Sequence, residues 1–376
     1  MAKKHDAIII GGGIIGAATG YYLSSKGLRI LLVEKDYLTA GSTGRCITGI
    51  RQQYSTPATI KIAMESVRIF RSMYKMLGMD VEWHASGYLF LAYSEDVAAM
   101  LKHNIQIQQK QGLDVRFIAA RECGQLVPLM DTAGLIGGAW CASDGQASPF
   151  LTVRAFQNGI QKNGGEIRIH TPVTGILKEK NRVAGIRTAT GDTHLAPVII
   201  NAAGPWAAEV SAMADIRLPV LPERHEALIT EPVRYEGVPM LVDYRADGGY
   251  FVQRVTGQFI GCFTPQKPLQ GKDISSSFTF LADMAARMVR LIPSLQDVAI
   301  LRQWAGSYSM SPDGSPIIGE TELKGFYCAA GMSGHGFMLG PAIGRLLAHY
   351  ITEQHWLFNV DEILYGREFG GKEKLA

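Results

Sequence analysis

Two glycine motifs lie near opposite ends of this 376-residue chain and have the composition of turns that bind nucleotides. The first spans residues 11–16 (GGGIIG) and the second spans residues 331–336 (GMSGHG). A glycine turn between a strand and a helix brings backbone amides and the helix N-terminus close to a phosphate. One cofactor long enough to contact both motifs would explain why a single chain carries them.

The first motif is specific about its ligand. Gly11 permits a tight turn after a short apolar strand, Gly13 leaves room for a pyrophosphate, and Gly16 lets the following helix approach the strand. Glu34 ends the next expected strand, residues 28–33. An acid at that position binds a ribose hydroxyl and repels a 2′-phosphate. The motif therefore predicts an ADP-like ligand, FAD or NAD, and argues against NADP.

The second motif favours a flavin over a nicotinamide. NAD needs only the first strand–helix–strand unit, whereas FAD must also be held at its isoalloxazine ring. Amides of residues 334–338, at the start of an expected helix, could meet the pyrimidine edge of that ring. A helix N-terminus there stabilises negative charge by roughly 0.3–2 kcal/mol. The alternative is a helix start whose glycines only allow close packing.

The composition excludes several other classes of protein. Apolar residues make up 47% of the chain, charged residues 19%, and the net charge is +3, so no nucleic-acid partner is expected. The five cysteines form no CxxC pair, which predicts no metal centre and a reducing, cytoplasmic location. No transmembrane segment is expected, because the apolar residues 7–23 contain glycines and follow Asp6, without a signal-peptide cleavage site.

The elements that must position these motifs predict an α/β fold with two domains. A Rossmann-like cofactor domain is expected from residues 1–83, 142–215 and 310–376. A mixed β-sheet domain for the substrate is expected from residues 84–141 and 216–309. Between residues 219 and 304, most expected strands alternate apolar and polar residues and are separated by turns. Ligand sites favour the junction between two such domains.

Several helix boundaries are also predicted. One helix is expected to begin near Pro57 and to stop at Gly78, a second to be capped by Ser94, and a third to span residues 278–291. The turn at residues 203–206 follows an apolar strand and is expected beside the first glycine motif, at the same edge of one sheet.

Five stretches of the chain together resemble the D-amino-acid-oxidase-like flavoproteins, over nearly its whole length. They are residues 11–16, 41–45 (GSTGR), 203–206 (AGPW), 312–319 (PDGSPIIG) and 330–337 (AGMSGHGF). Residues 48–54 (TGIRQQY) and 333–338 are most similar to the β subunits of sarcosine oxidase and dye-linked L-proline dehydrogenase. Opine and hydroxyproline dehydrogenase β subunits are close competitors. The resemblance implies a FAD-binding domain of the glutathione-reductase type with an inserted substrate domain.

The resemblance implies a noncovalent FAD, because no cysteine lies in residues 305–308, where monomeric members tether the flavin. Together with the glycine motifs it assigns to this FAD Gly11, Gly13, Ile14, Ile15, Gly16, Glu34, Lys35, Ser42, Thr43, Gly44, Arg45, Thr48, Gly49, Val173, Ala203, Gly204, Trp206, Gly306, Gly331, Gly334, His335, Gly336, Phe337 and Met338. A second flavin, FMN, at a contact with a partner subunit is left open, although its tethering histidine has no counterpart between Trp140 and Phe150.

The implied substrate is a small secondary or cyclic amino acid, oxidised to its imine by hydride transfer to flavin N5. Arg51 falls where related amine oxidases bind the substrate carboxylate; a phosphate contact or a surface ion pair is the alternative. His225 could accept a proton, although a strand histidine is more often packed. Tyr250 and Trp304, with Tyr308, could wall the substrate pocket, although strand aromatics commonly belong to the core.

Two departures from the oxidase pattern predict where the electrons go. Oxidase members carry a lysine where this chain has Met338, and a second lysine over the flavin at a position that matches Gly261. Electrons are therefore expected to pass to a partner subunit, another flavin or a dye, with the protein in the cytoplasm or at a membrane through its partner. An oxygen-using oxidase, a non-catalytic FAD-binding scaffold, a glycerol-3-phosphate dehydrogenase and an NAD enzyme are the alternatives.

Overall fold

Buried apolar strands form the sheet that carries both glycine motifs. The computed structural model describes residues 3–371 and 373. Its six-stranded sheet has the order β19-β20-β13-β2-β3-β9, and every neighbouring pair except β19–β20 is parallel. The bounds are β2 (Ala7–Ile10), β3 (Ile30–Val33), β9 (Glu166–Arg168), β13 (Ile199–Asn201), β19 (Ile317–Glu320) and β20 (Phe326–Ala330). Runs such as AIII and ILLV suit this sheet, because parallel strands are covered on both faces.

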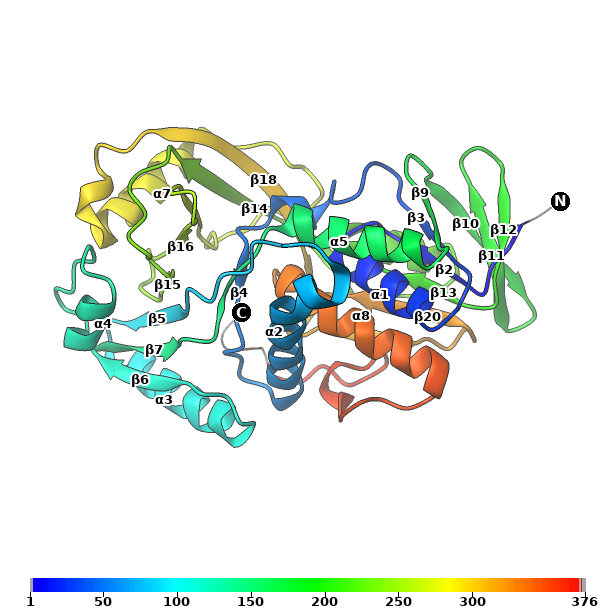
Figure 1. The fold of residues 1–376 in the computed structure, drawn as a ribbon, viewed down its shortest axis with the longest axis horizontal. Helices are drawn as coiled ribbons and strands as arrows, with labels where there is room; N and C mark the ends of the chain where they lie inside the picture. The colour runs from blue at the N-terminus through cyan, green and yellow to red at the C-terminus, as the bar shows by residue number, and fades with distance from the viewer. Residues whose placement is uncertain (1–2, 372, 374–376) are drawn as a thin grey trace.

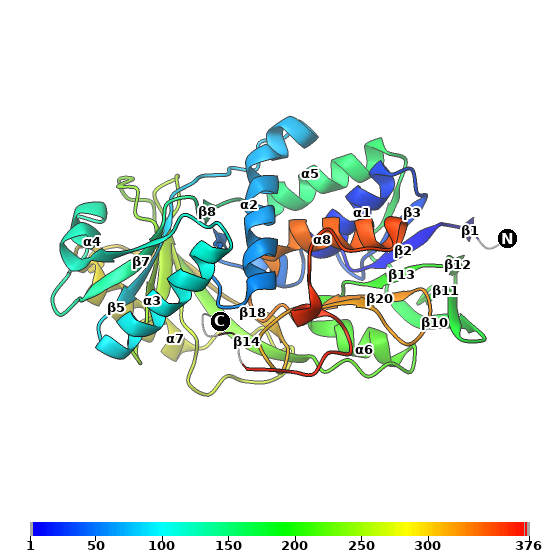
Figure 2. The same ribbon diagram turned by 90° about the horizontal axis from the view of Figure 1, so that it is seen from below.

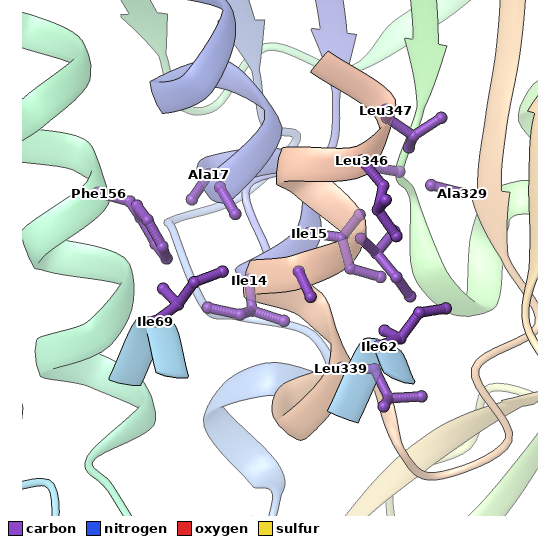
Figure 3. Packing of buried hydrophobic residues seen from close by; sticks show 14 of the residues in the cluster. Ile14, Ile15, Ala17, Ile62, Ile69, Phe156, Ala329, Leu339, Leu346 and Leu347 are labelled. Atoms are coloured by element: carbon purple, nitrogen blue, oxygen red, sulfur yellow. The ribbon is translucent and has the colours of Figure 1, made fainter. Parts of the chain in front are cut away.

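Helices cover one face of this sheet and a smaller sheet covers the other. The helices are α1 (Ile14–Ser25), α2 (Pro57–Leu77), α5 (Pro149–Lys162) and α8 (Gly336–Glu353), whose apolar side chains share one core cluster (Figure 3). The smaller sheet has the order β1-β12-β11-β10, with bounds β1 (Lys3–Lys4), β10 (Val173–Glu179), β11 (Arg182–Thr188) and β12 (Thr193–Leu195). Ile9 faces the helices and Ile8 the smaller sheet, as the period of a strand requires.

A second, eight-stranded sheet lies beside the first along the long axis of the molecule (Figure 1). Its order is β18-β14-β17-β16-β15-β5-β7-β6, and only the β5–β15 pair is parallel. The bounds are β5 (Tyr88–Ala92), β6 (Arg116–Ala119), β7 (Gly137–Cys141), β14 (Leu221–Thr230), β15 (Met240–Asp243), β16 (Tyr250–Gln253), β17 (Phe259–Cys262) and β18 (Ile300–Met310).

The two faces of the eight-stranded sheet have different neighbours. Helices α4 (Ala120–Leu126) and α7 (Phe278–Leu291) pack on one face, and α3 (Glu95–Lys110) packs on part of the other. Strands β14 and β18 lie nearest the six-stranded sheet, as both ribbon views show (Figure 2). The remaining elements are short: α6 (Ala207–Ala212), β4 (Gly49–Ile50) paired with β8 (Gly145–Gln146), and the 3₁₀ turns η1 (Ser42–Arg45), η2 (Gly204–Trp206), η3 (Pro293–Leu295) and η4 (Asp361–Ile363).

The mixed α/β fold confirms the predicted fold class, and the helix boundaries agree closely with the sequence. Helix α2 begins at Pro57 and ends before Gly78, whose φ of 69° is left-handed. Ser94 caps α3 by accepting a hydrogen bond from the amide of Val97, and α7 spans residues 278–291. Short elements such as α4, α6 and β7 were not predicted, because they are too short to show a period. No helix in residues 3–371 is long and apolar enough to cross a lipid bilayer.

Candidate functional site

Both glycine motifs line one cavity of about 820 Å³ between the two sheets. A cavity of this size suits a ligand larger than a simple amino acid. Most residues expected to bind the cofactor line it: Gly11, Gly13, Ile14, Ile15, Glu34, Lys35, Ser42, Thr43, Arg45, Thr48, Gly49, Val173, Ala203, Gly204, Trp206, Gly306, Gly334, His335, Gly336, Phe337 and Met338. Gly16, Gly44 and Gly331 are outside the lining.

The nucleotide end of the cavity is built from backbone that tolerates no side chain. A Cβ atom on Gly11, whose φ is 116°, would lie 2.4 Å from the carbonyl oxygen of Ala202. A Cβ atom on Gly16 would lie 1.9 Å from the carbonyl oxygen of Gly11. Gly16 therefore acts through packing, as its spacing predicted. The first contact also places the turn at residues 203–206 beside the first motif, which confirms that prediction.

Two charged residues, Glu34 and Lys35, lie at this end of the cavity. Glu34 accepts hydrogen bonds from the amide of Gly12 at 2.7 Å (N to Oε2) and from the amide of Asp36 at 2.9 Å (N to Oε1). Its carboxylate is thereby held at the cavity wall, with lone pairs left for a hydroxyl. The Lys35 ammonium lies 3.4 Å from the centre of the Trp206 ring.

The second motif forms the other end of the cavity, where α8 begins. Ser333 and Gly334 have φ values of 46° and 88°, so the chain makes a left-handed turn just before the helix. A Cβ atom on Gly334 would lie 2.4 Å from the ring of Tyr308 on β18. The turn therefore lies directly against the eight-stranded sheet, and the amides that start α8 open beside it.

Two buried hydroxyls test whether this cavity fits a bound dinucleotide. Thr48 Oγ1 and Ser307 Oγ are buried and have no hydrogen-bond partner within the described chain, and both residues line the cavity. An unsatisfied buried polar group costs about 1–3 kcal/mol. A long polar ligand that reached both hydroxyls would remove that cost. The residues of the cavity therefore fit FAD.

Arg51 follows strand β4 and places its guanidinium beside the second motif. The residue is 5% exposed, and its Nη2 atom lies 2.9 Å from Nε2 of His335. The guanidinium also lies 4.6 Å from the ring centre of Tyr54. Burial, and then the charge of Arg51, hold the pKa of His335 well below its usual value. His335 is therefore neutral, and its Nε2 can accept the hydrogen bond from the always charged guanidinium.

A buried carboxylate holds the backbone that carries Arg51. Asp144 is fully buried, and its Oδ1 accepts hydrogen bonds from the amide of Gln52 at 2.9 Å and from its side-chain Nε2 at 2.8 Å. Its Oδ2 accepts from Nε2 of Gln53 at 3.1 Å. Burial raises the pKa of Asp144 to about 6. Sequence reasoning missed this residue, because a lone aspartate after a strand carries no signal for a contact with residues 52 and 53.

The remaining predicted substrate residues separate into two groups. His225 and Tyr250 line the cavity, and the hydroxyl of Tyr250 lies 3.0 Å from that of Tyr308. Burial raises the pKa of Tyr250 well above its usual value, so this phenol is neutral. Trp304 is not among the lining residues. Its indole Nε1 donates to the carbonyl oxygen of Arg45 at 2.9 Å, so the structure places it as a support for the η1 turn.

A side chain at position 261 would point in a different direction from the one expected. A Cβ atom on Gly261 would lie 2.6 Å from Cε of Met284 on α7, so a side chain there would face away from the cavity. The neighbouring Cys262 lines the cavity instead. The expectation that position 261 faces the flavin is wrong, because successive residues of a strand point to opposite faces. Lys35, at the nucleotide end, is the only lysine among the described residues that line the cavity.

A comparison with known protein families agrees with this geometry. The family described as FAD dependent oxidoreductase matches residues 6–350. The chain belongs to this family. The match confirms the resemblance to D-amino-acid-oxidase-like flavoproteins that the five sequence stretches indicated.

Individual relatives cover nearly all of the chain. The crystal structure of L-proline dehydrogenase from P. horikoshii is 34% identical, covers 96% of both chains and has a TM-score of 0.91. Sarcosine oxidase subunit beta of Rhodobacter capsulatus is 26% identical over 358 residues, which cover 93% of this chain and 86% of that protein. Human mitochondrial sarcosine dehydrogenase is 27% identical over 93% of this chain, but the chain spans only 40% of that protein's length.

Proposed function

We propose that this chain catalyses the FAD-dependent oxidation of a small secondary or cyclic amino acid, of the proline, hydroxyproline, sarcosine or opine type, to its imine. The position of Arg51 carries the proposal. Its buried guanidinium lines the cavity and lies 2.9 Å from His335, in the turn expected to hold the flavin ring. A guanidinium binds both oxygens of a carboxylate at once, so a cation at this point suits an amino acid.

The two ends of the cavity would hold the two parts of FAD. The first motif, Glu34 and the η1 turn would hold the ADP part, and the second motif would hold the ring. Bound FAD supplies the oxidant, because its N5 accepts a hydride from the carbon next to the substrate nitrogen. The buried hydroxyls of Thr48 and Ser307 would complete their hydrogen bonds with this cofactor.

The work of the chain itself is positioning. With the carboxylate on Arg51, the C–H bond next to the nitrogen is held in one orientation, and such fixation can supply a large share of a rate enhancement. Tyr88, Tyr244 and Tyr250 line the cavity. Burial raises the pKa of Tyr88 to about 12, so its phenol stays neutral and forms a wall without charge. Such walls favour the short apolar body of a cyclic or N-alkyl amino acid.

Electrons are proposed to leave to a partner subunit or another acceptor rather than to oxygen. The support is that the described lining of the ring end contains no lysine, and that one relative is a sarcosine oxidase subunit beta. Partner subunits and an FMN at their contact stay predictions from the resemblance.

Anaerobic reduction of the bound flavin tests the proposal. The FAD-loaded chain is mixed separately with L-proline, hydroxyproline, sarcosine and an opine, and the flavin absorbance is followed. At least one of these should bleach the flavin and give a dehydrogenated product by mass spectrometry. A flavin that no compound bleaches would support a non-catalytic scaffold instead. Peroxide formed as fast as a dye is reduced would contradict the proposed acceptor and favour an oxidase.

A further inference from the structure

Strands β14 and β18 bring a histidine and a glutamate together at the cavity. In the antiparallel register Glu223 is opposite Tyr308, and His225 is opposite Gly306. Directly opposite residues point to the same face of a sheet, and so do residues two apart on one strand. Glu223, His225 and Tyr308 therefore share a face. His225 and Tyr308 both line the cavity, and the second motif packs against Tyr308.

The imidazole of His225 is hydrogen-bonded at one ring nitrogen and has no partner at the other within the described chain. Its Nε2 lies 2.9 Å from Oε1 of Glu223, and its ring stacks on that of Tyr308 with centres 3.8 Å apart and planes 14° apart. Its Nδ1 is buried and has no partner within residues 3–371 and 373. Because the carboxylate accepts a hydrogen bond from Nε2–H, the lone pair of the ring is on Nδ1.

Other charged and titratable groups lie near His225 and Glu223, but the hydrogen bond of the His225 ring is with the Glu223 carboxylate. Arg45 of the η1 turn packs over Gly306, the residue opposite His225, and Arg51 and Arg245 also line the cavity. Burial keeps the Cys262 thiol on β17 and the Tyr308 phenol on β18 neutral, since it raises the pKa of both.

The next acid along the strand has other partners. Glu226 accepts hydrogen bonds from the amide and hydroxyl of Ser277 and from Nε2 of Gln303, and it lies 3.5 Å from Nη2 of Arg224. The carboxylate that is hydrogen-bonded to the His225 ring belongs to Glu223. Protonation of the ring would place its new charge beside this acid.

The proposed reaction needs a free amine. Hydride can leave the carbon only if the neighbouring nitrogen has a lone pair to form the imine bond. The ammonium of a secondary amino acid has a pKa near that of a lysine, about 10.4, so roughly one molecule in 2,500 is a free amine at pH 7. A proton acceptor inside the cavity would remove this limitation.

We infer that His225, oriented by Glu223, takes the proton from the ammonium of the bound substrate. The inference rests on the proposed function. An N–H bond of the ammonium breaks, its electron pair stays on the amine nitrogen, and a new N–H bond forms at Nδ1 of His225. The Glu223 carboxylate stabilises the imidazolium that results. His225 is the proton acceptor, and Glu223 is a positioning residue that fixes its tautomer.

The experiment measures anaerobic flavin reduction at pH 6–10 in the FAD-loaded chain, with whichever of L-proline, hydroxyproline, sarcosine and an opine bleaches the wild type fastest. His225→Asn should reduce the rate at pH 7 by about 100-fold, the lower end of general-base effects. The loss should shrink as the pH approaches 10, because the solution then supplies free amine. His349→Asn, a partly exposed histidine on α8 outside the cavity lining, is the control and should leave the profile unchanged.

Glu223→Gln provides a second test that keeps a side chain of the same shape. It should slow reduction about tenfold at pH 7 and move the rise of the rate to higher pH, an effect that a merely structural role would not produce. Acetate, which has a carboxylate and no amine, should perturb the flavin spectrum of both variants with the affinity of the wild type. Equal losses at all pH values, or no loss, would overturn the inference. A wild type that is bleached by none of L-proline, hydroxyproline, sarcosine and an opine would overturn the proposed function itself.

Discussion

The two ends of the cavity are built by opposite means. At the nucleotide end, the absence of side chains is what matters. Gly11 and Gly16 let two strands and a helix approach closely, and a backbone amide holds the Glu34 carboxylate. At the substrate end, particular side chains form the cavity wall. Those of Arg51, His225 and His335 come from segments far apart in the sequence and line the same cavity. The comparison shows that one end depends on local backbone shape and the other on the directions of side chains.

The largest expected effect comes from adding one methyl group at the nucleotide end. Gly16→Ala places a Cβ where the Gly11 carbonyl oxygen already lies, 1.9 Å away. Overpacking of this kind typically costs about 1–3 kcal/mol, and here it must also move the phosphate-binding turn. The variant should purify with little or no FAD and with a lower melting temperature.

Gly175→Ala is the matched control, because the nearest atom to its new Cβ is 4.0 Å away. This control should retain FAD and wild-type stability. Full FAD content in Gly16→Ala would show that the nucleotide end does not depend on the close approach.

Removing a side chain at the substrate end should leave the cofactor in place. Arg51→Ala loses up to two charge-assisted hydrogen bonds to the substrate, each worth about 1.5–3 kcal/mol. Substrate affinity should fall at least 100-fold, measured by anaerobic titration of the flavin absorbance, with the FAD content unchanged. Arg68→Ala, a surface arginine on α2, is the control. Loss of FAD from Arg51→Ala would assign this arginine to the cofactor end instead.

Asp144, which supports the segment that carries Arg51, should contribute less to substrate affinity than Arg51 itself, and its contribution should depend on pH. Asp144→Asn keeps one acceptor oxygen but removes the negative charge and the second oxygen, which accepts from Nε2 of Gln53 in the segment that follows Arg51. We therefore expect substrate affinity about fivefold weaker at pH 8. The raised pKa of Asp144, about 6, means that the wild-type carboxylate gains a proton as the pH falls through 6. The affinities of wild type and variant should therefore converge between pH 7 and pH 5. A constant ratio across that range would contradict a role for the ionised carboxylate.

The smallest expected effect concerns a single hydroxyl at the boundary of the two ends. Ser307→Ala removes a buried Oγ that lines the cavity without a partner in the described part of the chain. If this hydroxyl binds FAD, a hydrogen bond worth about 0.5–1.5 kcal/mol is lost, and FAD should bind about 2- to 10-fold more weakly. Flavin fluorescence titration of the apoprotein measures this, with Ser72→Ala on α2 as the control. Tighter FAD binding by Ser307→Ala would show that the hydroxyl makes no hydrogen bond to FAD and that its burial opposes binding.

The sequence was informative wherever a function depends on neighbours along the chain. The roles of Gly11 and Gly16 follow from a strand–turn–helix order, and the helix stop at Gly78 follows from its left-handed backbone. Family membership was also readable, because its motifs are local. Asp144 was not readable as part of the site, since its partners are about ninety residues away, as the separations of 91 and 92 positions show.

Position 261 shows that the direction of a side chain on a strand is also difficult to predict from the sequence. A residue can be placed on β17 from its pattern, but a shift of one position turns its side chain from the cavity to α7. Strand register does not separate Tyr250 from Trp304, because the pairs Trp304–Ala227, Ala227–Cys262 and Cys262–Tyr250 place both on one face of the sheet. Trp304 is outside the cavity lining, and its indole donates a hydrogen bond to the carbonyl oxygen of Arg45.

By itself, the sequence determined that this chain folds around a dinucleotide-binding turn and carries a second turn for a longer cofactor, because both properties reside in consecutive backbone. Only the tertiary structure decided that Arg51 meets His335 and that Glu223 orients His225 at the same cavity. Strand register and the packing of the two sheets set these contacts, and neither is a property of any single segment.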